Sequence, residues 1–295
     1  MNGGRRASVL ITGAGGQVGL ELQATAPSGW QVVPCRSADL DVTDAATVDR
    51  VLKQAAPEVV INAAAFTRVD DAERDSGRAE AVNGHGAGNV ARAAARQGAR
   101  MIQLSTDFVF DGSQGRPYSP DDTPNPLGAY GRTKLLGEQL VQEHTGGRAL
   151  IVRTAWVYAA AGHNFVRTML RLMRERPSVG VVGDQIGTPT WARGLAQALW
   201  RAVELDTLVG ILHWTDAGVA SWYDFAVAIQ EESLALGLLE RAVPIQALHS
   251  HEYPTPARRP GFSVLDKSTG WAALGGPAPH WRVNLRCMLQ GLAHA

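Results

Sequence analysis

Tyr130 and Lys134 are the residues of this sequence whose types and spacing point most directly to chemistry. They stand four positions apart in the segment 128–134, which reads GAYGRTK. On a helix, residues i and i+4 lie on one face, about 5–6 Å apart. An ammonium group beside a phenol favours the phenolate and lowers the phenol pKa from its usual value of about 10. The pair suggests a proton donor or acceptor usable near neutral pH, although an exposed tyrosine beside a solvated lysine gives the same short motif.

A glycine-rich segment near the start of the chain supplies context that this short motif lacks. We expect a buried strand over residues 8–12 and a helix from about Gln17. Between them, Gly13, Gly16 and Gly19 follow the spacing G-x-x-G-x-x-G. Glycines at a strand–turn–helix junction let the backbone approach a pyrophosphate at the positive end of the helix. This context favours dinucleotide binding over a simple tight turn.

The first half of the chain predicts the scaffold that would position these residues, because short apolar segments alternate there with helical patterns. Five strands are expected, over residues 8–12, 30–34, 58–61, 100–104 and 149–153. Parallel strands joined by right-handed helical crossovers form a sheet that is covered on both faces. The predicted fold class is α/β, a Rossmann-type doubly wound parallel sheet with a smaller C-terminal substrate-binding lobe.

The second half of the chain is less regular and carries loops rich in glycine and proline. We therefore expect the chain to cross between two parts more than once. The dinucleotide-binding Rossmann domain is predicted to comprise residues 1–154 plus about 179–206. The substrate-binding lobe is predicted to comprise about 155–178 and 207–295.

The residues after the second strand bear on the choice of cofactor. An acidic residue there would bind the ribose hydroxyls of NAD, whereas an arginine suits the 2′-phosphate of NADP. This chain has Arg36 at that position, with no acidic residue before Asp39 and Asp41. Arg36 favours NADPH over NADH, with a solvated surface arginine as the alternative. The small residues 63–65, which follow the third strand, would let a cofactor lie close to the backbone.

A wider pattern becomes visible at the end of the fourth strand, where Ser105 and Thr106 precede the tyrosine–lysine pair. This order, after a glycine loop, resembles the extended short-chain dehydrogenase/reductase superfamily. Within it, the sequence resembles the dTDP-4-dehydrorhamnose reductase family from Val9 to Leu265. The segments that carry this likeness are Asn62–Thr67 with Val69 and Asp70, Ser105–Gly112, Tyr130–Glu138, Arg153–Tyr158, Asn164–Leu170 and Asp184–Thr190.

The resemblance implies reduction of dTDP-4-dehydro-L-rhamnose to dTDP-L-rhamnose with NADPH or NADH. Tyr130 would protonate the C4 oxygen, and Thr106 would polarise the ketone. Lys134 would hold the nicotinamide ribose and lower the pKa of Tyr130. These roles supply the proton and the oxyanion stabilisation that a ketone needs when it accepts a hydride.

The same reading gives sets of binding residues. Catalytic residues are expected to be Thr106, Tyr130 and Lys134. Cofactor contacts are expected from Gly13, Gly16, Gln17, Val18, Arg36, Asp41, Val42, Ala63, Ala64, Ala65, Tyr130 and Lys134. Substrate contacts are expected from Thr67, Val69, Thr106, Phe108, Trp156, Asn164 and Arg258, with Arg259 as the alternative to Arg258. No metal ligands are assigned, and a metal at a subunit contact stays open.

Two positions depart from the family pattern. Phe108 stands where the family usually has tyrosine, and Phe262 stands where it usually has asparagine. Both changes replace a polar side chain with an apolar one, so a reductase of another nucleotide-linked 4-keto deoxysugar stays open. A non-catalytic NAD(P)-binding regulatory subunit is the alternative from another class. The intact set of Thr106, Tyr130 and Lys134 favours the enzyme.

Composition limits the partners. Lysine plus arginine equals aspartate plus glutamate, at 28 each, which gives no sign of nucleic-acid or membrane binding. Two cysteines form no disulfide framework and fit a reducing compartment. No segment approaches the roughly 20 apolar residues of a membrane span, and the basic residues 1–6 lack the apolar region of a signal peptide. We expect a cytoplasmic protein that binds a dTDP-linked 4-keto sugar, with a homodimer as an open possibility.

Overall fold

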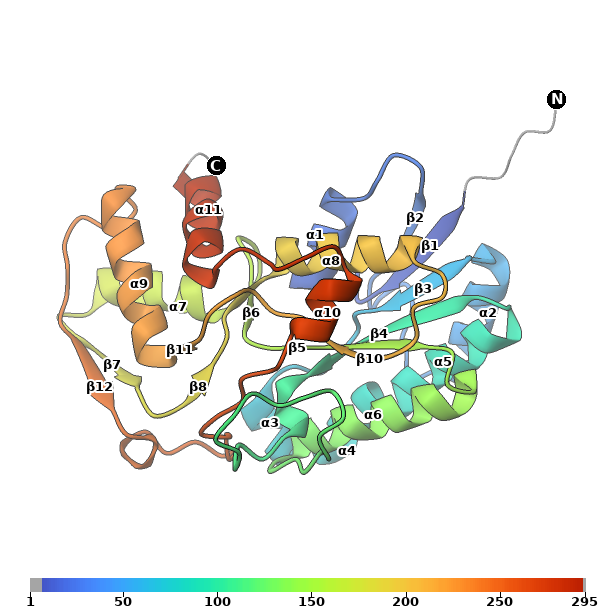
Figure 1. The fold of residues 1–295 in the computed structure, drawn as a ribbon, viewed down its shortest axis with the longest axis horizontal. Coiled ribbons are helices and arrows are strands. Elements are labelled where there is room, and N and C mark those ends of the chain that lie inside the picture. The colour runs from blue at the N-terminus through green and yellow to red at the C-terminus, as the bar shows by residue number, and fades with distance from the viewer. Residues whose placement is uncertain (1–6, 294–295) are drawn as a thin grey trace.

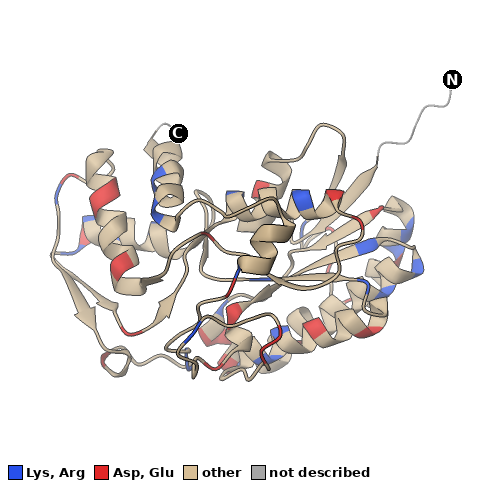
Figure 2. Cartoon of the chain, viewed as in Figure 1, with Lys and Arg blue, Asp and Glu red and all other residues tan. Residues whose placement is uncertain are grey.

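The computed structural model describes residues 7–293, which form a sheet between helices and a smaller lobe beside it (Figure 1). Residues 1–6 and 294–295 lie outside the described residues, and so does the expectation about a signal peptide. Acidic and basic residues are both scattered over the helices and loops (Figure 2). Among residues 7–293, no helix combines the length and apolar character needed to cross a membrane.

The central sheet has six parallel strands within the described residues, in the order β10-β5-β4-β3-β1-β2. Its strands are β1 (Ser8–Thr12), β2 (Gln31–Cys35), β3 (Val59–Asn62), β4 (Arg100–Thr106), β5 (Leu150–Thr154) and β10 (Gly210–His213). All five neighbouring pairs run parallel. The order reverses at β1: β2 lies on one side of it, and β3, β4 and β5 follow in sequence on the other, which is the topology of a doubly wound sheet. The predicted fold class is confirmed.

Helices cover both faces of this sheet. They are α1 (Gln17–Ala24), α2 (Ala45–Ala55), α4 (Ser76–Glu80), η1 (Ala81–Gly86), α5 (Ala87–Arg96), α6 (Ala129–Thr145) and α8 (Ala192–Glu204). One face carries α1 and α8 in mutual contact, while α5 contacts α2 and α6 on the other. Val9 and Ile11 are buried in the core beneath α8, and Leu10 in the core beneath α2. Alternate strand residues thus serve opposite cores, which explains why these strands are apolar on both faces.

The helices α4 and α5 are joined by the π-helical turn η1. Asn83 in this turn accepts a hydrogen bond from the Phe66 amide (2.8 Å) and donates one to the Phe66 carbonyl (3.1 Å). Gly84 lies against Leu136 of α6, where a β-carbon would come within 2.7 Å of the leucine side chain. The turn therefore ties α6 to the segment after β3, and π-turns often mark such positions.

The smaller lobe, at the left of Figure 1, is built from short strand pairs and three longer helices. The pairs are β6 (Val157–Tyr158) with β9 (Thr190–Trp191), β7 (Val179–Val182) with β12 (Ile245–Leu248), and β8 (Ile186–Gly187) with β11 (Ala220–Ser221). The helices are α7 (Phe165–Glu175), α9 (Trp222–Ala235) and α11 (Trp281–Ala293). Of the shorter elements, α3 (Val69–Arg74) and η2 (Asp107–Val109) contact α6, α10 (Ser268–Ala273) contacts β10, and η3 (Ser250–Glu252) follows β12. The lobe has a core of its own, centred on Phe225 and Ile229.

The observed division differs from the expected domain boundaries in two places. Strand β10 belongs to the central sheet, because it pairs with β5, although residues 207–295 were expected in the lobe. Strand β7 pairs with β12 of the lobe, although 179–206 was expected in the Rossmann domain. Of that second segment, α8 does cover the sheet. The strand that β7 or β10 pairs with decides which domain it belongs to, and local sequence patterns do not show pairing between distant segments.

Candidate active site

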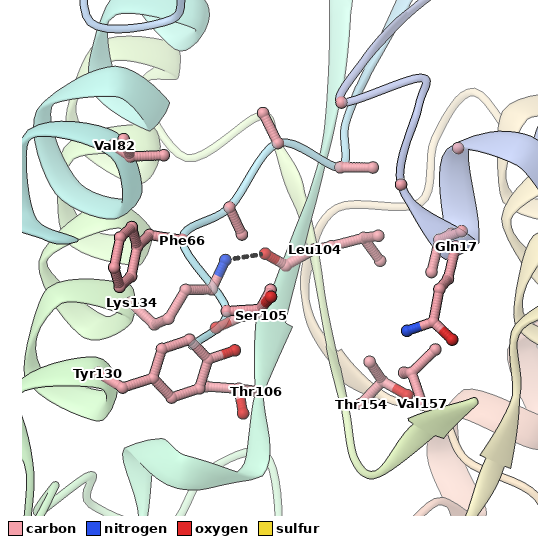
Figure 3. A pocket seen from close by; sticks show the side chains of 18 of the residues that line it. Gln17, Phe66, Val82, Leu104, Ser105, Thr106, Tyr130, Lys134, Thr154 and Val157 are labelled. Atoms are coloured by element: carbon pink, nitrogen blue, oxygen red, sulfur yellow. Dashed lines mark hydrogen bonds between the residues drawn. The ribbon is translucent and has the colours of Figure 1, made fainter. Parts of the chain in front are cut away.

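A cavity of about 1090 Å³ lies at the carboxyl ends of the strands, between the sheet domain and the lobe. It is lined by the glycine loop, by residues 63–67, by the end of β4, by α6 and by the segment after β5. Figure 3 shows Tyr130, Lys134 and Thr106 on one side of it and Gln17 on the other. Ligands of doubly wound sheets bind at this edge, where the strand order reverses.

The glycine loop closes tightly against the segment after β3. Gly13 has φ +64°, and a β-carbon there would lie 2.6 Å from the Ala64 backbone nitrogen. A β-carbon on Gly19 would lie 2.4 Å from the Gly13 carbonyl oxygen. Gly16 caps α1 without any side-chain hydrogen bond, so the first amides of the helix stay free for an anion. These features fit the pyrophosphate of a dinucleotide.

Arg36 borders the cavity at the tip of β2 and is exposed to solvent. Its aliphatic carbons run beside Gly15, where a β-carbon would lie 3.7 Å from Cγ. The nearest downstream acid in the cavity wall, Asp41, uses its Oδ1 to accept from the Thr43 amide (2.9 Å) and hydroxyl (2.8 Å). A free guanidinium beside an engaged carboxylate suits a 2′-phosphate better than two ribose hydroxyls.

Lys134 is buried beneath the cavity and is held by the main chain of β4. Its Nζ donates a hydrogen bond of 2.7 Å to the Leu104 carbonyl oxygen (Figure 3). Burial lowers the pKa of Lys134 to about 8, and the negative charge of Glu138 opposes that shift. Glu138, one turn along α6, is itself held by Arg153 through two hydrogen bonds of 2.9 and 2.7 Å. Lys134 keeps two further N–H donors for a ligand.

Tyr130 differs from the sequence-based expectation in its ionisation. Burial raises the pKa of Tyr130 to about 12, Asp107 adds to that rise and the Thr106 hydroxyl opposes it. The expected lowering of this pKa by Lys134 is therefore wrong, because the loss of solvent dominates and Thr106, rather than Lys134, is the group that opposes the rise. The physical consequence is that Tyr130 is a neutral phenol at pH 7, which is the form that donates a proton.

The position of Tyr130 follows from the start of α6. The Glu73 carboxylate accepts a hydrogen bond from the Ala129 amide at the first turn of the helix. Gly131 lies so close to η2 that a β-carbon would come within 2.1 Å of the Phe108 carbonyl oxygen. This contact presses the helix start against the end of β4. The ring of Phe108 meets the ring of Tyr130 edge to face, with centroids 5.6 Å apart.

Thr106 has a neighbour that the sequence patterns did not single out. Its hydroxyl donates a hydrogen bond of 3.1 Å to Oδ1 of Asp107 and accepts one of 3.2 Å from the Phe108 amide. Asp107 is fully buried, and burial raises its pKa to about 6. Hydrogen bonds to the side chains of Ser263 and Thr106 oppose that rise. An acid directly after the Ser-Thr pair at a strand end was the available signal for this residue.

The expected substrate-binding residues divide into two groups. Those in the cavity wall are Thr67, Val69, Thr106, Phe108 and Trp156. Trp156 adopts φ +45° and stacks on Trp222 at 3.5 Å with 6° between the ring planes. Trp222 lies far away in the sequence, at the start of α9, and no local pattern marked it. The two rings form one aromatic wall of the cavity.

Asn164 and Arg258 are the expected residues that do not line the cavity. Asn164 caps α7, and its Nδ2 donates to the Gln17 side chain at 2.9 Å, so it touches the cavity only through Gln17. Arg258 is exposed, whereas Arg259 lines the cavity. Arg259 is held by Asp70 through hydrogen bonds of 2.8 and 3.1 Å. The structure therefore favours Arg259, the alternative named above, and its contact with the substrate stays a prediction.

The remaining expected cofactor contacts lie together. The cavity wall includes Gly13, Gly16, Gln17, Val18, Arg36, Asp41, Val42, Ala63, Ala64, Ala65, Tyr130 and Lys134. This proximity is consistent with the expectation, and the assignment of each contact stays a prediction. Within the described residues, no group of three or more His, Cys, Asp or Glu side chains is arranged to hold a metal ion.

Known proteins resemble this chain over nearly its whole length. A family model described as the RmlD substrate binding domain matches residues 7–294. A dTDP-4-dehydrorhamnose reductase of Burkholderia thailandensis is 44% identical, over 93% of this chain and 95% of that protein. A protein of the same name from Mycobacterium tuberculosis is 42% identical, over 99% of this chain and 95% of its own length.

Solved structures agree with these sequence matches. A dTDP-4-dehydrorhamnose reductase from Clostridium acetobutylicum superposes with a TM-score of 0.91 at 38% identity, covering 97% of this chain and 99% of its own. One from Bacillus anthracis, in complex with NADP, has a TM-score of 0.90 at 34% identity and covers 96% of this chain and 99% of its own. The resemblance read from the sequence is confirmed, and the chain belongs to the dTDP-4-dehydrorhamnose reductase family.

Proposed function

We propose that this protein reduces the C4 ketone of dTDP-4-dehydro-L-rhamnose to give dTDP-L-rhamnose, with NADPH as the reductant. The observation that carries the proposal is the meeting of Thr106, Tyr130 and Lys134 in one cavity with the glycine loop. Relatives that share most of their length with this chain bear the name of that activity. A binding module without catalysis has no need of all three side chains.

The residues present fit a bound NADPH. The glycine loop and the free amides of α1 would hold the pyrophosphate, and Arg36 would hold the 2′-phosphate. Lys134 would bind the nicotinamide ribose with the donors that Leu104 leaves free. The relative from Bacillus anthracis was solved with NADP. When bound, the nicotinamide supplies the hydride that the ketone carbon accepts.

Tyr130 serves as the proton donor in this reaction. With a pKa of about 12, its phenol is neutral at physiological pH and carries the proton that the C4 oxygen requires. As negative charge develops on that oxygen, the nearby ammonium of Lys134 stabilises it electrostatically. The raised pKa of Tyr130 thus suits reduction, because the proton is present before the reaction starts.

Thr106 needs a change of hydrogen-bond partner to act on the ketone. Its single proton is donated to Asp107, so the ketone oxygen and Asp107 would compete for it. When the Asp107 carboxyl is protonated, it can donate to the Thr106 oxygen and leave the hydroxyl proton for the substrate. The pKa of about 6 for Asp107 brings this exchange close to physiological pH.

Phe108 bears on which sugar the protein reduces. Phe108, at the Tyr130 ring, presents an apolar edge where the family usually has a hydroxyl. A different nucleotide-linked 4-keto deoxysugar is therefore the second candidate substrate. Both candidates use the same reaction and the same cofactor site.

Turnover decides between these candidates. NADPH oxidation is measured with dTDP-4-dehydro-L-rhamnose generated enzymatically in place, with Tyr130→Phe as the inactive control. Wild-type turnover at least 100-fold above that control, roughly the lower bound of general acid catalysis, supports the proposal. Turnover no higher than the control, with NADPH still bound, removes the assignment of this substrate.

Location and partners follow from the free thiols and the charge balance. Cys35 and Cys287 are both unpaired, which suits a reducing compartment such as the cytoplasm. The equal numbers of acidic and basic residues give no reason to expect nucleic-acid or membrane binding. A homodimer stays a prediction, which sedimentation equilibrium of the purified protein would test.

A further inference from the structure

A row of buried polar side chains crosses three neighbouring strands behind the cofactor cavity. Thr12, Asn62 and Gln103 are aligned in register on β1, β3 and β4, so all three point to the face that α6 covers. Each is at most 2% exposed. The Thr12 hydroxyl donates to Oδ1 of Asn62, and Nδ2 of Asn62 donates to Oε1 of Gln103 at 2.7 Å.

The row continues into the main chain that holds Lys134. Nε2 of Gln103 donates to the Leu104 carbonyl oxygen at 2.7 Å. The same oxygen accepts the 2.7 Å hydrogen bond from Nζ of Lys134, drawn as a dashed line in Figure 3. Each amide orientation follows from its neighbour, since Oδ1 of Asn62 also faces the Ala64 amide at 3.3 Å. The chain of bonds therefore has one direction, from Thr12 to Leu104.

The two ends of the row lie at opposite walls of the cavity. Thr12 precedes Gly13 of the glycine loop, and its oxygen faces the Ala64 amide at 3.4 Å. Lys134 lies at the other end, under the expected nicotinamide ribose. An amide side chain in the middle of a parallel sheet costs stability unless every polar atom is paired. An apolar residue would pack at 103 without that requirement, so the amide does something that packing alone does not explain.

We propose that Gln103 is a positioning residue that fixes the Leu104 carbonyl and thereby the ammonium of Lys134. Gln103 touches neither cofactor nor substrate. Gln103 acts by holding the Leu104 carbonyl oxygen in the direction that Lys134 requires. Through Asn62, the Thr12 hydroxyl connects Gln103 to the glycine loop. The kinetic part rests on the proposed reductase function, whereas the effect on NADPH binding does not.

The main test replaces the amide with an apolar side chain of similar length. Among residues 7–293, Gln103→Met leaves the Leu104 carbonyl oxygen with Lys134 as its only side-chain donor. We expect the Kd for NADPH, measured by the fluorescence of the bound dinucleotide, to rise about fivefold, and kcat to fall about tenfold. The KM for the sugar should change less than about twofold, because the cavity wall at the sugar is untouched. Ile102→Val, on the opposite face of β4, is the matched control for lost stability.

A second variant adds a readout that a purely structural role would not move. Gln103→Glu keeps the shape, and its protonated carboxyl accepts from Asn62 and donates to Leu104 as the amide does. Above the pKa of the introduced carboxyl that donor is lost, so kcat and NADPH affinity should fall with rising pH more steeply than in the wild type. The charged side chains buried on this face are Lys134 and Glu138 of α6 and Arg153 of β5, whereas Arg132 and Glu143 of α6 are exposed. All five are the same in wild type and variant.

The outcomes are separable. A Gln103→Met protein with the NADPH Kd and kcat of Ile102→Val would overturn the proposal. If Gln103→Met does not fold, Gln103→Glu decides alone, and a pH profile parallel to that of the wild type would overturn it. A wild-type protein that binds NADPH without turning over the sugar would remove the proposed function and leave the binding test of Gln103 intact.

Discussion

The ionisation of Lys134 makes the pH dependence of cofactor binding a sharp prediction. Its side chain is 4% exposed, and burial lowers its pKa to about 8 from an ordinary value of 10.5. If the charged ammonium is what binds the ribose, affinity for NADPH is complete well below pH 8 and declines above it. At pH 9 about one molecule in eleven keeps the charge, which corresponds to a loss of about tenfold in affinity.

The assay is an equilibrium titration of NADPH between pH 7 and 9.5, with Lys134→Met as the control. The variant lacks the ammonium, so its Kd should be higher than that of the wild type at pH 7 and constant with pH. The contribution of Lys134 to folding stability changes with pH in the opposite direction to cofactor affinity, because the pKa of Lys134 is lower in the folded than in the unfolded chain. Between pH 8 and about 10 the unfolded chain binds more protons, so this group makes unfolding less favourable as pH rises. A wild-type Kd that stays constant to pH 9.5 would refute this account of Lys134.

Three further predictions concern the neighbours of this pair. Arg36→Ala should raise the Kd for NADPH about tenfold and leave that for NADH nearly unchanged, because one charge-assisted contact to the 2′-phosphate is lost; equal changes for both cofactors would remove the role of Arg36. In the wild type, kcat should fall as pH rises through about 6, the pKa to which burial raises Asp107, and the step should vanish in Asp107→Asn; a step of the same size in the variant would show that another group titrates. Phe108→Tyr should lower the KM for dTDP-4-dehydro-L-rhamnose about fivefold by adding a hydrogen bond; an unchanged KM, measured by initial rates, would favour another sugar.

The parts of the fold that depend on local spacing were predictable from the sequence. The glycine loop could be predicted from the spacing of Gly13, Gly16 and Gly19 between a strand and a helix, because a residue without a side chain permits close backbone contacts. The pair Tyr130 and Lys134 required only helical spacing. The fold class followed because alternating strands and helices leave few allowed topologies.

Other parts depend on contacts between distant segments. The pKa of Tyr130 is set by how deeply the ring is enclosed, which its neighbours in the sequence do not show. The choice of Arg259 over Arg258 depends on Asp70, which lies in another part of the chain. The stack of Trp156 on Trp222 brings a helix of the lobe to the cavity. Strand β10 joins the sheet only because β5 offers it a parallel edge.

The row of hydrogen bonds from Thr12 to Gln103 also could not be predicted from the sequence. A glutamine in an apolar strand segment gives no motif, and its meaning appears only when three strands lie in register. Its hydrogen-bond partners then follow, because each buried donor and acceptor must be paired. Hydrogen-bond direction, rather than residue spacing, connects it to Lys134.

The most direct measurement of the central claim is the rate of NADPH oxidation by wild type and Tyr130→Phe with dTDP-4-dehydro-L-rhamnose. The variant removes the phenolic proton, so kcat should fall at least 100-fold, roughly the lower bound of general acid catalysis, in a protein that still binds NADPH. The product should be dTDP-L-rhamnose. A Tyr130→Phe enzyme that keeps wild-type kcat and product would contradict the assignment of Tyr130 as the proton donor.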